Sequence, residues 1–111
     1  DHLASLAADV HDLEVLYETM CDAIERDGAP GADVGLLKIL ASELQQRICD
    51  FNASILGDHG TVVGEDEIGG LAIDLHWQLM MARPATIFGG ASEVQRDILA
   101  GAVLGLRKAG A

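Results

Sequence analysis

Hydrophobic positions in the first quarter of the chain recur at steps of three and four residues. The series is Leu3, Leu6, Val10, Leu13, Tyr17, Met20 and Ile24. This spacing places one apolar stripe on an amphipathic helix. The segment 26–33, RDGAPGAD, ends the pattern with two glycines and a proline.

A second stripe follows after this break and stops at Gly57. Its members are Leu36, Leu37, Leu40, Leu44, Ile48, Phe51 and Ile55. Each of the two segments is long enough for about seven helical turns. Two such helices with a short connection predict an antiparallel helical hairpin.

The second half of the chain alternates glycine-rich segments with shorter helical patterns. Residues 56–70, LGDHGTVVGEDEIGG, predict a loop with room for a short turn. Residues 71–82, LAIDLHWQLMMA, predict a third helix with Ile73, Trp77 and Met80 on one side. This helix is expected to stop before Pro84.

A fourth helix is predicted to begin at Ser92, whose hydroxyl forms the pattern of a capping box with Gln95. Its predicted inner face consists of Val94, Ile98, Ala102 and Leu106. Arg107 and Lys108 would complement the negative end of the helix dipole. The predicted fold class is therefore all-α, an up-and-down helical bundle of the four-helix type. Residues 1–111 are expected to form a single domain.

The apolar faces of the predicted helices are wider than packing against a single neighbouring helix requires. Adjacent hydrophobic pairs such as Leu36–Leu37, Met80–Met81 and Ile98–Leu99 broaden them. Two explanations are open: the wide faces fill the core of one bundle, or they meet a further surface from more chain or from a partner subunit.

The charge balance restricts the partners that the chain can bind. Seven Lys and Arg against 18 Asp and Glu give a formal net charge of −11, which disfavours nucleic acid and anionic membranes. No apolar run approaches the roughly 20 residues of a membrane span. Residues 1–14 lack the basic region of a signal peptide. Cys21 and Cys49 are expected as free thiols, and a cytoplasmic location is predicted.

Few residue patterns point to chemistry. The nearest approach to a dimetal Glu-x-x-His pair is His11 to Glu14, in reversed order, so no metal site is predicted. Asp58 and His59 are expected as a solvated loop pair rather than an acid/base pair. Gly89 and Gly90 are different, because they remove side chains just before a helix N-terminus. Backbone N–H groups there can approach an anion, although a simple helix cap explains the same pattern.

Residues 85–106, ATIFGGASEVQRDILAGAVLGL, resemble the C-terminal signature of the acyl-CoA dehydrogenase family. In that signature an aromatic residue, a small or acidic residue, Gly, Thr or Ser, Ser or Asn, and Glu or Gln precede IQR or VQR. Residues 54–60, SILGDHG, resemble the family's glycine-rich LGG-x-G turn at the end of a long helix. The order of the predicted helices extends the resemblance over essentially the whole chain.

The resemblance implies a flavoprotein that uses FAD to oxidise an acyl-CoA to a 2-enoyl-CoA. In the family, a carboxylate removes the α proton and flavin N5 accepts the β hydride. FAD lies between a β domain and the C-terminal domains of two subunits. This chain corresponds to the C-terminal four-helix domain without its first helix, which would cover the wide apolar faces. The full-length protein would bind acyl-CoA and assemble as a homo- or hetero-oligomer.

The resemblance also implies roles for particular residues. The turn that would approach the FAD of a neighbouring subunit consists of Ser54, Ile55, Leu56, Gly57 and Asp58. The residues that would contact the FAD phosphate or ribose are Ala91, Ser92 and Glu93. Gly90 would lie close to the substrate thioester.

Three departures from the family pattern limit this assignment. Gly89 occupies the position of the usual catalytic Glu and cannot act as a base, so no catalytic residue is predicted in the chain. Ala91 replaces the usual Thr, which removes a hydroxyl. Asp58 replaces the second glycine of the turn, and its carboxylate would repel a pyrophosphate unless it points away.

Two functions follow from these observations. In the first, the chain is the C-terminal domain of an FAD-dependent acyl-CoA dehydrogenase, contributes to FAD contacts and oligomerisation, and is inactive by itself. In the second, it is an acidic all-α module for oligomerisation or interaction without catalytic activity. A gene product that also encodes a β domain favours the first, and a reading frame that starts near Asp1 favours the second.

Overall fold

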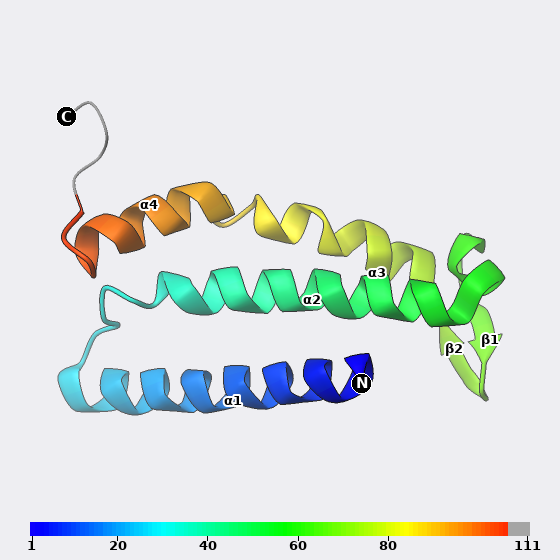
Figure 1. Cartoon of the computed structure of the whole chain (residues 1–111), viewed down its shortest axis with the longest axis horizontal. Coiled ribbons are helices and arrows are strands. Elements are labelled where there is room, and N and C mark those ends of the chain that lie inside the picture. Colours follow the sequence, from blue (N-terminus) through cyan, green and yellow to red (C-terminus); the bar gives the residue numbers. More distant parts are fainter. Residues whose placement is uncertain (107–111) are drawn as a thin grey trace.

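The computed structural model describes residues 1–106, which are mainly helical (Figure 1). The elements in chain order are α1 (His2–Asp27), α2 (Gly35–Leu56), the 3₁₀ turn η1 (Gly57–Thr61), β1 (Asp66–Ile68), β2 (Leu71–Ile73), α3 (Leu75–Ala82), the 3₁₀ turn η2 (Pro84–Thr86) and α4 (Ser92–Ala102). The predicted all-α class is confirmed, and the two strands form only a small antiparallel hairpin.

The first two helices form the antiparallel hairpin that their hydrophobic patterns predict. Asp1 begins α1 by accepting a hydrogen bond from the Leu3 backbone N–H at 3.0 Å. Gly28 ends it in the left-handed region, with φ 76° and its N–H donating to the Ile24 carbonyl. α2 then runs back along α1, so the His2 and Phe51 rings lie 5.1 Å apart at the far end.

α2 is the central helix of the molecule. Figure 1 shows α1 on one side of it, and α3 and α4 end to end on the other. The buried hydrophobic side chains are Leu6, Met20, Ile39, Leu44, Cys49, Leu75 and Ala82. No large side chain in residues 1–106 is fully buried. The Cα radius of gyration of 17.3 Å exceeds the roughly 13 Å of a compact domain of this length, so the helices form an open layer rather than a closed bundle.

The third helix starts later than predicted. Residues 71–73 form β2, which pairs with β1 across Gly69 and Gly70. α3 begins at Leu75, where the Asp74 carboxylate accepts a hydrogen bond from the Trp77 N–H at 2.7 Å. The predicted loop over residues 56–70 therefore contains η1 and the first strand. The predicted stop before Pro84 is confirmed, because α3 ends at Ala82.

α4 begins at Ser92 as predicted, but its predicted capping box is wrong. The N-cap position is Ala91, with φ −56° and ψ 147°, and no side chain caps the helix. Ser92 is already helical, and its hydroxyl donates to the Thr86 carbonyl at 3.3 Å. The Gln95 amide turns back to the Gly89 carbonyl instead of the N-cap N–H.

The predicted inner face of α4 is also wrong. Val94 and Ile98 are 52% and 51% exposed, whereas Gln95 lies against Gly35 of α2. The helix ends at Ala102, and Gly105, with φ 68°, lets the Leu106 N–H donate to the Ala100 carbonyl. The predicted role of residues 107 and 108 at the helix end lies outside the described residues. Every helix within residues 1–106 is too short or too polar to cross a bilayer.

Candidate functional site

The turn formed by residues 89–91 contains two glycines, one packed against a neighbouring side chain and one with open space beside it. Gly89 and Gly90 have φ values of 72° and 100°, which only glycine adopts readily. A Cβ on Gly90 would collide with the Gln95 amide nitrogen. A Cβ on Gly89 would have no atom within 4 Å, so the backbone at Gly89 is open to an approaching molecule.

Lys38 and Gln95 hold this turn against the first turn of α2. The Lys38 ammonium donates to the Gly90 carbonyl at 2.6 Å from a half-buried position. The Gln95 amide lies between Gly90 and Gly35, where an added Cβ would come within 2.5 Å of its oxygen. Side chains from two elements, Lys38 of α2 and Gln95 of α4, therefore fix the conformation of a turn that is only a few residues long.

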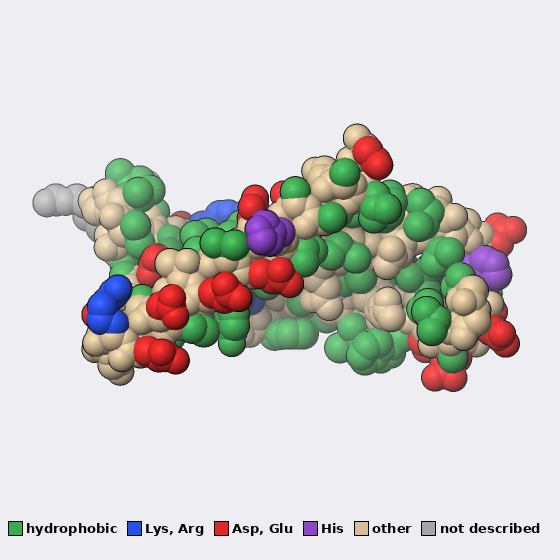
Figure 2. Space-filling model, turned by 90° about the horizontal axis from the view of Figure 1, so that it is seen from below, with side chains coloured by type: hydrophobic (Ala, Val, Ile, Leu, Met, Phe, Trp, Pro, Cys, Tyr) green, Lys and Arg blue, Asp and Glu red, His purple; other side chains and the backbone are tan. Residues whose placement is uncertain are grey.

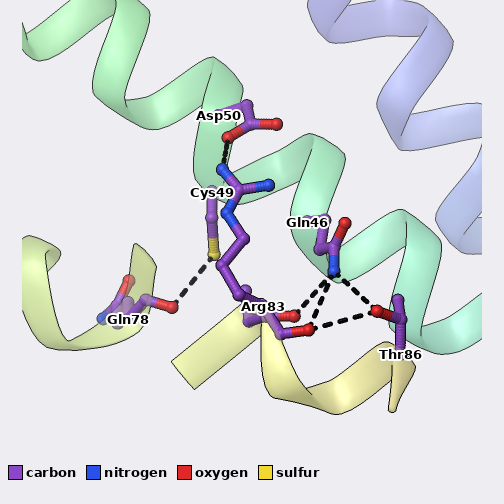
Figure 3. Close-up of polar contacts among 7 residues, drawn as sticks. Gln46, Cys49, Asp50, Gln78, Arg83 and Thr86 are labelled. Atoms are coloured by element: carbon purple, nitrogen blue, oxygen red, sulfur yellow. Dashed lines mark hydrogen bonds and ion pairs between the residues drawn. The ribbon is translucent and has the colours of Figure 1, made fainter. Parts of the chain in front are cut away.

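Gln46 contacts the segment around Arg83 and Thr86, where α3 has ended and the chain leads toward the turn (Figure 3). The Gln46 amide of α2 donates to the Ala82 carbonyl at 3.0 Å and to the Arg83 carbonyl at 3.3 Å. It also lies 3.3 Å from the Thr86 hydroxyl. These bonds give partners to carbonyl groups at the point where α3 stops, so they fix how the chain enters η2.

Two further contacts link α2 to α3 beside Gln46. The Cys49 thiol donates to the Gln78 carbonyl over 3.7 Å, and Arg83 forms an ion pair with Asp50. Burial is the main cause that raises the pKa of the Cys49 thiol, and Asp50 adds to it. The thiol is therefore held neutral as a weak donor, which suits packing and not nucleophilic chemistry.

The residues predicted to contact FAD phosphate or ribose lie together at the start of α4. Ala91 is half-buried and Glu93 is exposed. Ser92 is buried, and its hydroxyl hydrogen is already used by the Thr86 carbonyl. The side chains thus offer little to a ligand, whereas the backbone of the turn remains accessible at Gly89.

The second predicted set, from Ser54 to Asp58, lies at the opposite end of α2. The Ser54 hydroxyl donates to the Phe51 carbonyl at 2.7 Å, and Gly57 leaves the helix with φ 54° and open space around it. Lys38 and Leu56 are separated by 18 residues of α2, or about 27 Å of helix. The structure therefore does not bring the two predicted sets together within one chain.

Other polar residues singled out in the sequence have local partners. The His59 ring nitrogen Nδ1 lies 2.5 Å from the Asp66 carboxylate of β1, and this hydrogen bond is the main cause that lowers the pKa of Asp66. His11 and Glu14 form a long, exposed contact of 4.0 Å. Both cysteines are free thiols. Among residues 1–106 no group of three or more His, Cys, Asp or Glu side chains is arranged to hold a metal ion.

Sequence reasoning missed Lys38 and Gln46, which organise the approach to the turn. A signal existed for each of them. Lys38 is the only Lys or Arg between Arg26 and Arg47. Gln46 is a polar residue in the middle of α2. Because the helix is interrupted at Pro84, the carbonyl groups at its end require a donor from a neighbouring element.

An uncharged groove, which we call the apolar groove, crosses α1, α2 and α3. It has a volume of about 620 Å³, and its lining includes Val10, Ile48, Trp77, Met81 and Phe88. A second hollow continues it toward Tyr17 and Leu37, because both are lined by Leu13 and Ala41. Trp77 and Phe88 are 60% and 57% exposed. Such an exposed apolar surface is typical of an interface.

The opposite side of α2 carries the charges. Glu43, Arg47 and Asp50 recur at helical spacing on that side. They form ion pairs with Arg96, Asp9 and Arg83, respectively. Figure 2 shows acidic side chains spread along α1, the helix nearest the viewer, with hydrophobic side chains exposed beside them. The two faces of the helical layer therefore differ in chemistry.

Comparison with known proteins gives a family match. The sequence model of the family described as "Acyl-CoA dehydrogenase, C-terminal domain" matches residues 1–104. No curated protein and no solved structure matches the chain significantly. The family match covers nearly all of the 111 residues and includes both glycine turns. The chain therefore belongs to the acyl-CoA dehydrogenase family and is a fragment that matches its C-terminal domain.

Proposed function

We propose that residues 1–111 are the single C-terminal helical domain of an FAD-dependent enzyme that oxidises acyl-CoA to 2-enoyl-CoA. In this proposal the domain contributes to FAD contacts and to oligomerisation, and it is inactive by itself. The observation that carries the proposal is the turn at residues 89–91, which is held rigidly and leaves the Gly89 backbone open. The cytoplasmic location remains a prediction.

The residues of the turn fit an anionic cofactor group through their backbone. No side chain of the described residues caps α4, so the first N–H groups of the helix are suited to an external acceptor. The Lys38 ammonium adds positive charge beside them. Glu93 acts in the opposite sense, because it places an exposed carboxylate in the first turn of α4. When bound, FAD would supply the hydride acceptor, and Ala91, Ser92 and Glu93 would lie at its phosphate or ribose.

The second turn, from Ser54 to Asp58, is proposed to meet the FAD of another subunit. It lies about 27 Å of helix away from the first turn. We therefore propose that the two turns of one chain contact two different FAD molecules. Ile55 and Gly57 are exposed, which makes this end of α2 accessible to a neighbouring subunit. Asp58 is expected to point away from the pyrophosphate.

The base that removes the α proton is proposed to lie outside this chain. Gly89 has no side chain, and the nearest acid along the chain, Glu93, is an exposed residue in the first turn of α4. Gly90 would come close to the thioester of an acyl-CoA, and a carboxylate from another segment would complete the site. An isolated chain would therefore bind no substrate productively.

Oligomerisation is proposed to involve the apolar groove. The lining residues carry no charge in a chain whose formal charge is −11, and three large side chains at its rim remain exposed. A further helix or a second subunit that covers Trp77, Met81 and Phe88 would remove this apolar surface from water. The alternative function, an acidic oligomerisation module without catalysis, uses the same groove and lacks the flavin.

The test is to compare the purified chain with the complete product of its gene. The chain alone is expected to show no flavin absorbance and no turnover of any acyl-CoA. The complete product is expected to contain a β domain, to purify with flavin, and to lose flavin absorbance when acyl-CoA is added. Turnover by the isolated chain would contradict the proposal. A complete product without flavin would favour the oligomerisation module.

A further inference from the structure

Lys38 differs from the other cations in the described part of the chain. Arg26, Arg47, Arg83 and Arg96 each form an ion pair with a carboxylate. The Lys38 ammonium has no such partner among residues 1–106 and donates to the Gly90 carbonyl at 2.6 Å. This half-buried cation therefore binds a neutral carbonyl group, although the chain contains 18 acidic residues.

The position of Lys38 is unfavourable for helix electrostatics. Lys38 is the fourth residue of α2, and its ammonium reaches the peptide that begins α4. Both helix starts carry partial positive charge, which acidic side chains would stabilise better than a cation. Helix stability alone therefore does not account for a lysine here.

The contact with Gly90 has a consequence for the neighbouring N–H. The Gly90 carbonyl and the Ala91 N–H belong to one peptide group, and a charge-assisted hydrogen bond to the oxygen polarises the whole group. The Ala91 N–H therefore becomes a stronger donor. Together with the packing of Gln95, the same bond restrains Gly90, which as a glycine could adopt a wide range of φ values and here has a φ of 100°.

We propose that Lys38 is a positioning residue that fixes the turn at residues 89–91 and strengthens the Ala91 N–H as a donor toward the bound cofactor. The fixing of the turn stands on the geometry of this chain. The purpose of the strengthened donor rests on the proposed function. Lys38 itself touches the turn and is not a catalytic residue.

The experiment has two parts and uses the same variants in both. The 111-residue chain is examined by NMR as wild type, Lys38→Met, Lys38→Arg and Glu43→Gln. Glu43→Gln is the matched control, because it weakens the other polar link between α2 and α4, the ion pair with Arg96. FAD affinity is then measured for the complete flavoprotein with the same changes.

Lys38→Met is expected to shift the Ala91 amide proton upfield and to weaken FAD binding by up to about tenfold, because the Ala91 N–H becomes a weaker donor and the turn is held less firmly. Lys38→Arg is expected to keep both the Ala91 amide shift and the FAD affinity close to the wild-type values. Glu43→Gln is expected to change neither. A scalar coupling between the Lys38 ammonium and the Gly90 carbonyl in the wild type tests the contact even if Lys38→Met fails to fold.

Other outcomes separate the two proposals. An unchanged Ala91 amide in Lys38→Met, an absent coupling, or equal effects of Lys38→Met and Glu43→Gln would each overturn the positioning role. A complete wild-type protein that binds no FAD would overturn the proposed function. In that case the NMR comparison still decides whether Lys38 fixes the turn.

Discussion

Gln46 shows how one side chain supports the interruption of the helix at Pro84, which precedes the turn at residues 89–91. Pro84 has no N–H, so the carbonyl of Met80 loses the partner that it would have in a longer helix. The Arg83 N–H turns to Met80 over 3.3 Å, and the Ala82 and Arg83 carbonyls accept from Gln46 instead. The geometry after α3 is thus set by a residue of α2.

Replacement of Gln46 by Leu is expected to destabilise the chain by about 1–3 kcal/mol, because the partly buried Ala82 carbonyl loses its donor. Unfolding in urea, followed by circular dichroism, measures the change. Glu18→Leu serves as the control, because Glu18 is an exposed residue of α1 that forms none of these bonds and does not line the apolar groove; its effect should stay within about 0.5 kcal/mol. Equal effects of the two variants would show that the Gln46 bonds contribute nothing.

The His59–Asp66 pair predicts how the stability of the chain changes at acidic pH. The hydrogen bond from His59 lowers the pKa of the Asp66 carboxyl in the folded chain. The stability that it contributes is therefore present above the unfolded pKa of about 3.9 and is lost as the pH falls through the lower folded value. His59→Asn should raise the Asp66 pKa toward its ordinary value, as measured by carboxyl NMR titration. An unchanged titration would show that the pair does not form in solution.

At the scale of elements, the hairpin between η1 and α3 depends on its two-residue turn. Gly69 and Gly70 have φ values of 60° and 80°, as a type I′ turn requires. An added Cβ at either position would meet no atom within 4 Å. Substitutions there act through backbone strain alone.

Gly69→Val is expected to destabilise the hairpin by about 1–2 kcal/mol, the cost of a left-handed conformation for a residue with a side chain. Gly69→Asn should be tolerated, because Asn enters this conformation more easily. Hydrogen exchange at the amides of residues 66–73 measures the local effect. Identical exchange in both variants would argue against the turn type.

Most elements could be predicted from the sequence, but the contacts between them could not. The stripes from Leu3 to Ile24 and from Leu36 to Ile55 identified the two long helices, because each helix has one dominant apolar side. The hairpin was missed although Gly69–Gly70 between short β-prone segments is a recognised signal. The inner face of α4 was wrong because periodicity locates an apolar stripe without saying what covers it. Here Val94 and Ile98 face away from α2.

In the candidate site, too, the local features could be predicted from the sequence and the contacts between elements could not. The glycines at positions 89 and 90 were identified from residue types, since only glycine suits the backbone that they adopt. The roles of Lys38 and Gln46 required the structure, because 52 residues separate Lys38 from Gly90 and 36 separate Gln46 from Ala82. A local pattern contains no information about such contacts.

At the scale of the whole molecule, the helices form an open layer with two unlike faces. One face carries the ion pairs of Glu43, Arg47 and Asp50. The other contains the apolar groove, in which Trp77 and Phe88 stay more than half exposed. This asymmetry supports the proposal that another helix or subunit covers the groove.

The groove predicts self-association that a charge would disrupt. The wild-type chain should sediment as an oligomer, and Trp77→Asp should shift it toward monomer, since a buried unpaired carboxylate is costly. Val15→Asp is the control, because Val15 is an exposed apolar residue of α1 that does not line the groove. A wild-type monomer with a fully cooperative melt would contradict this prediction.

The central place of α2 determines how the molecule would open. α1 and α4 lie on opposite sides of α2, and each docks mainly against that helix (Figure 1). Either can therefore detach while the other stays in place, so unfolding has two separable local steps before the global one. Amides of α1 and α4 should exchange with solvent at independent rates, and those of α2 should be the last to exchange.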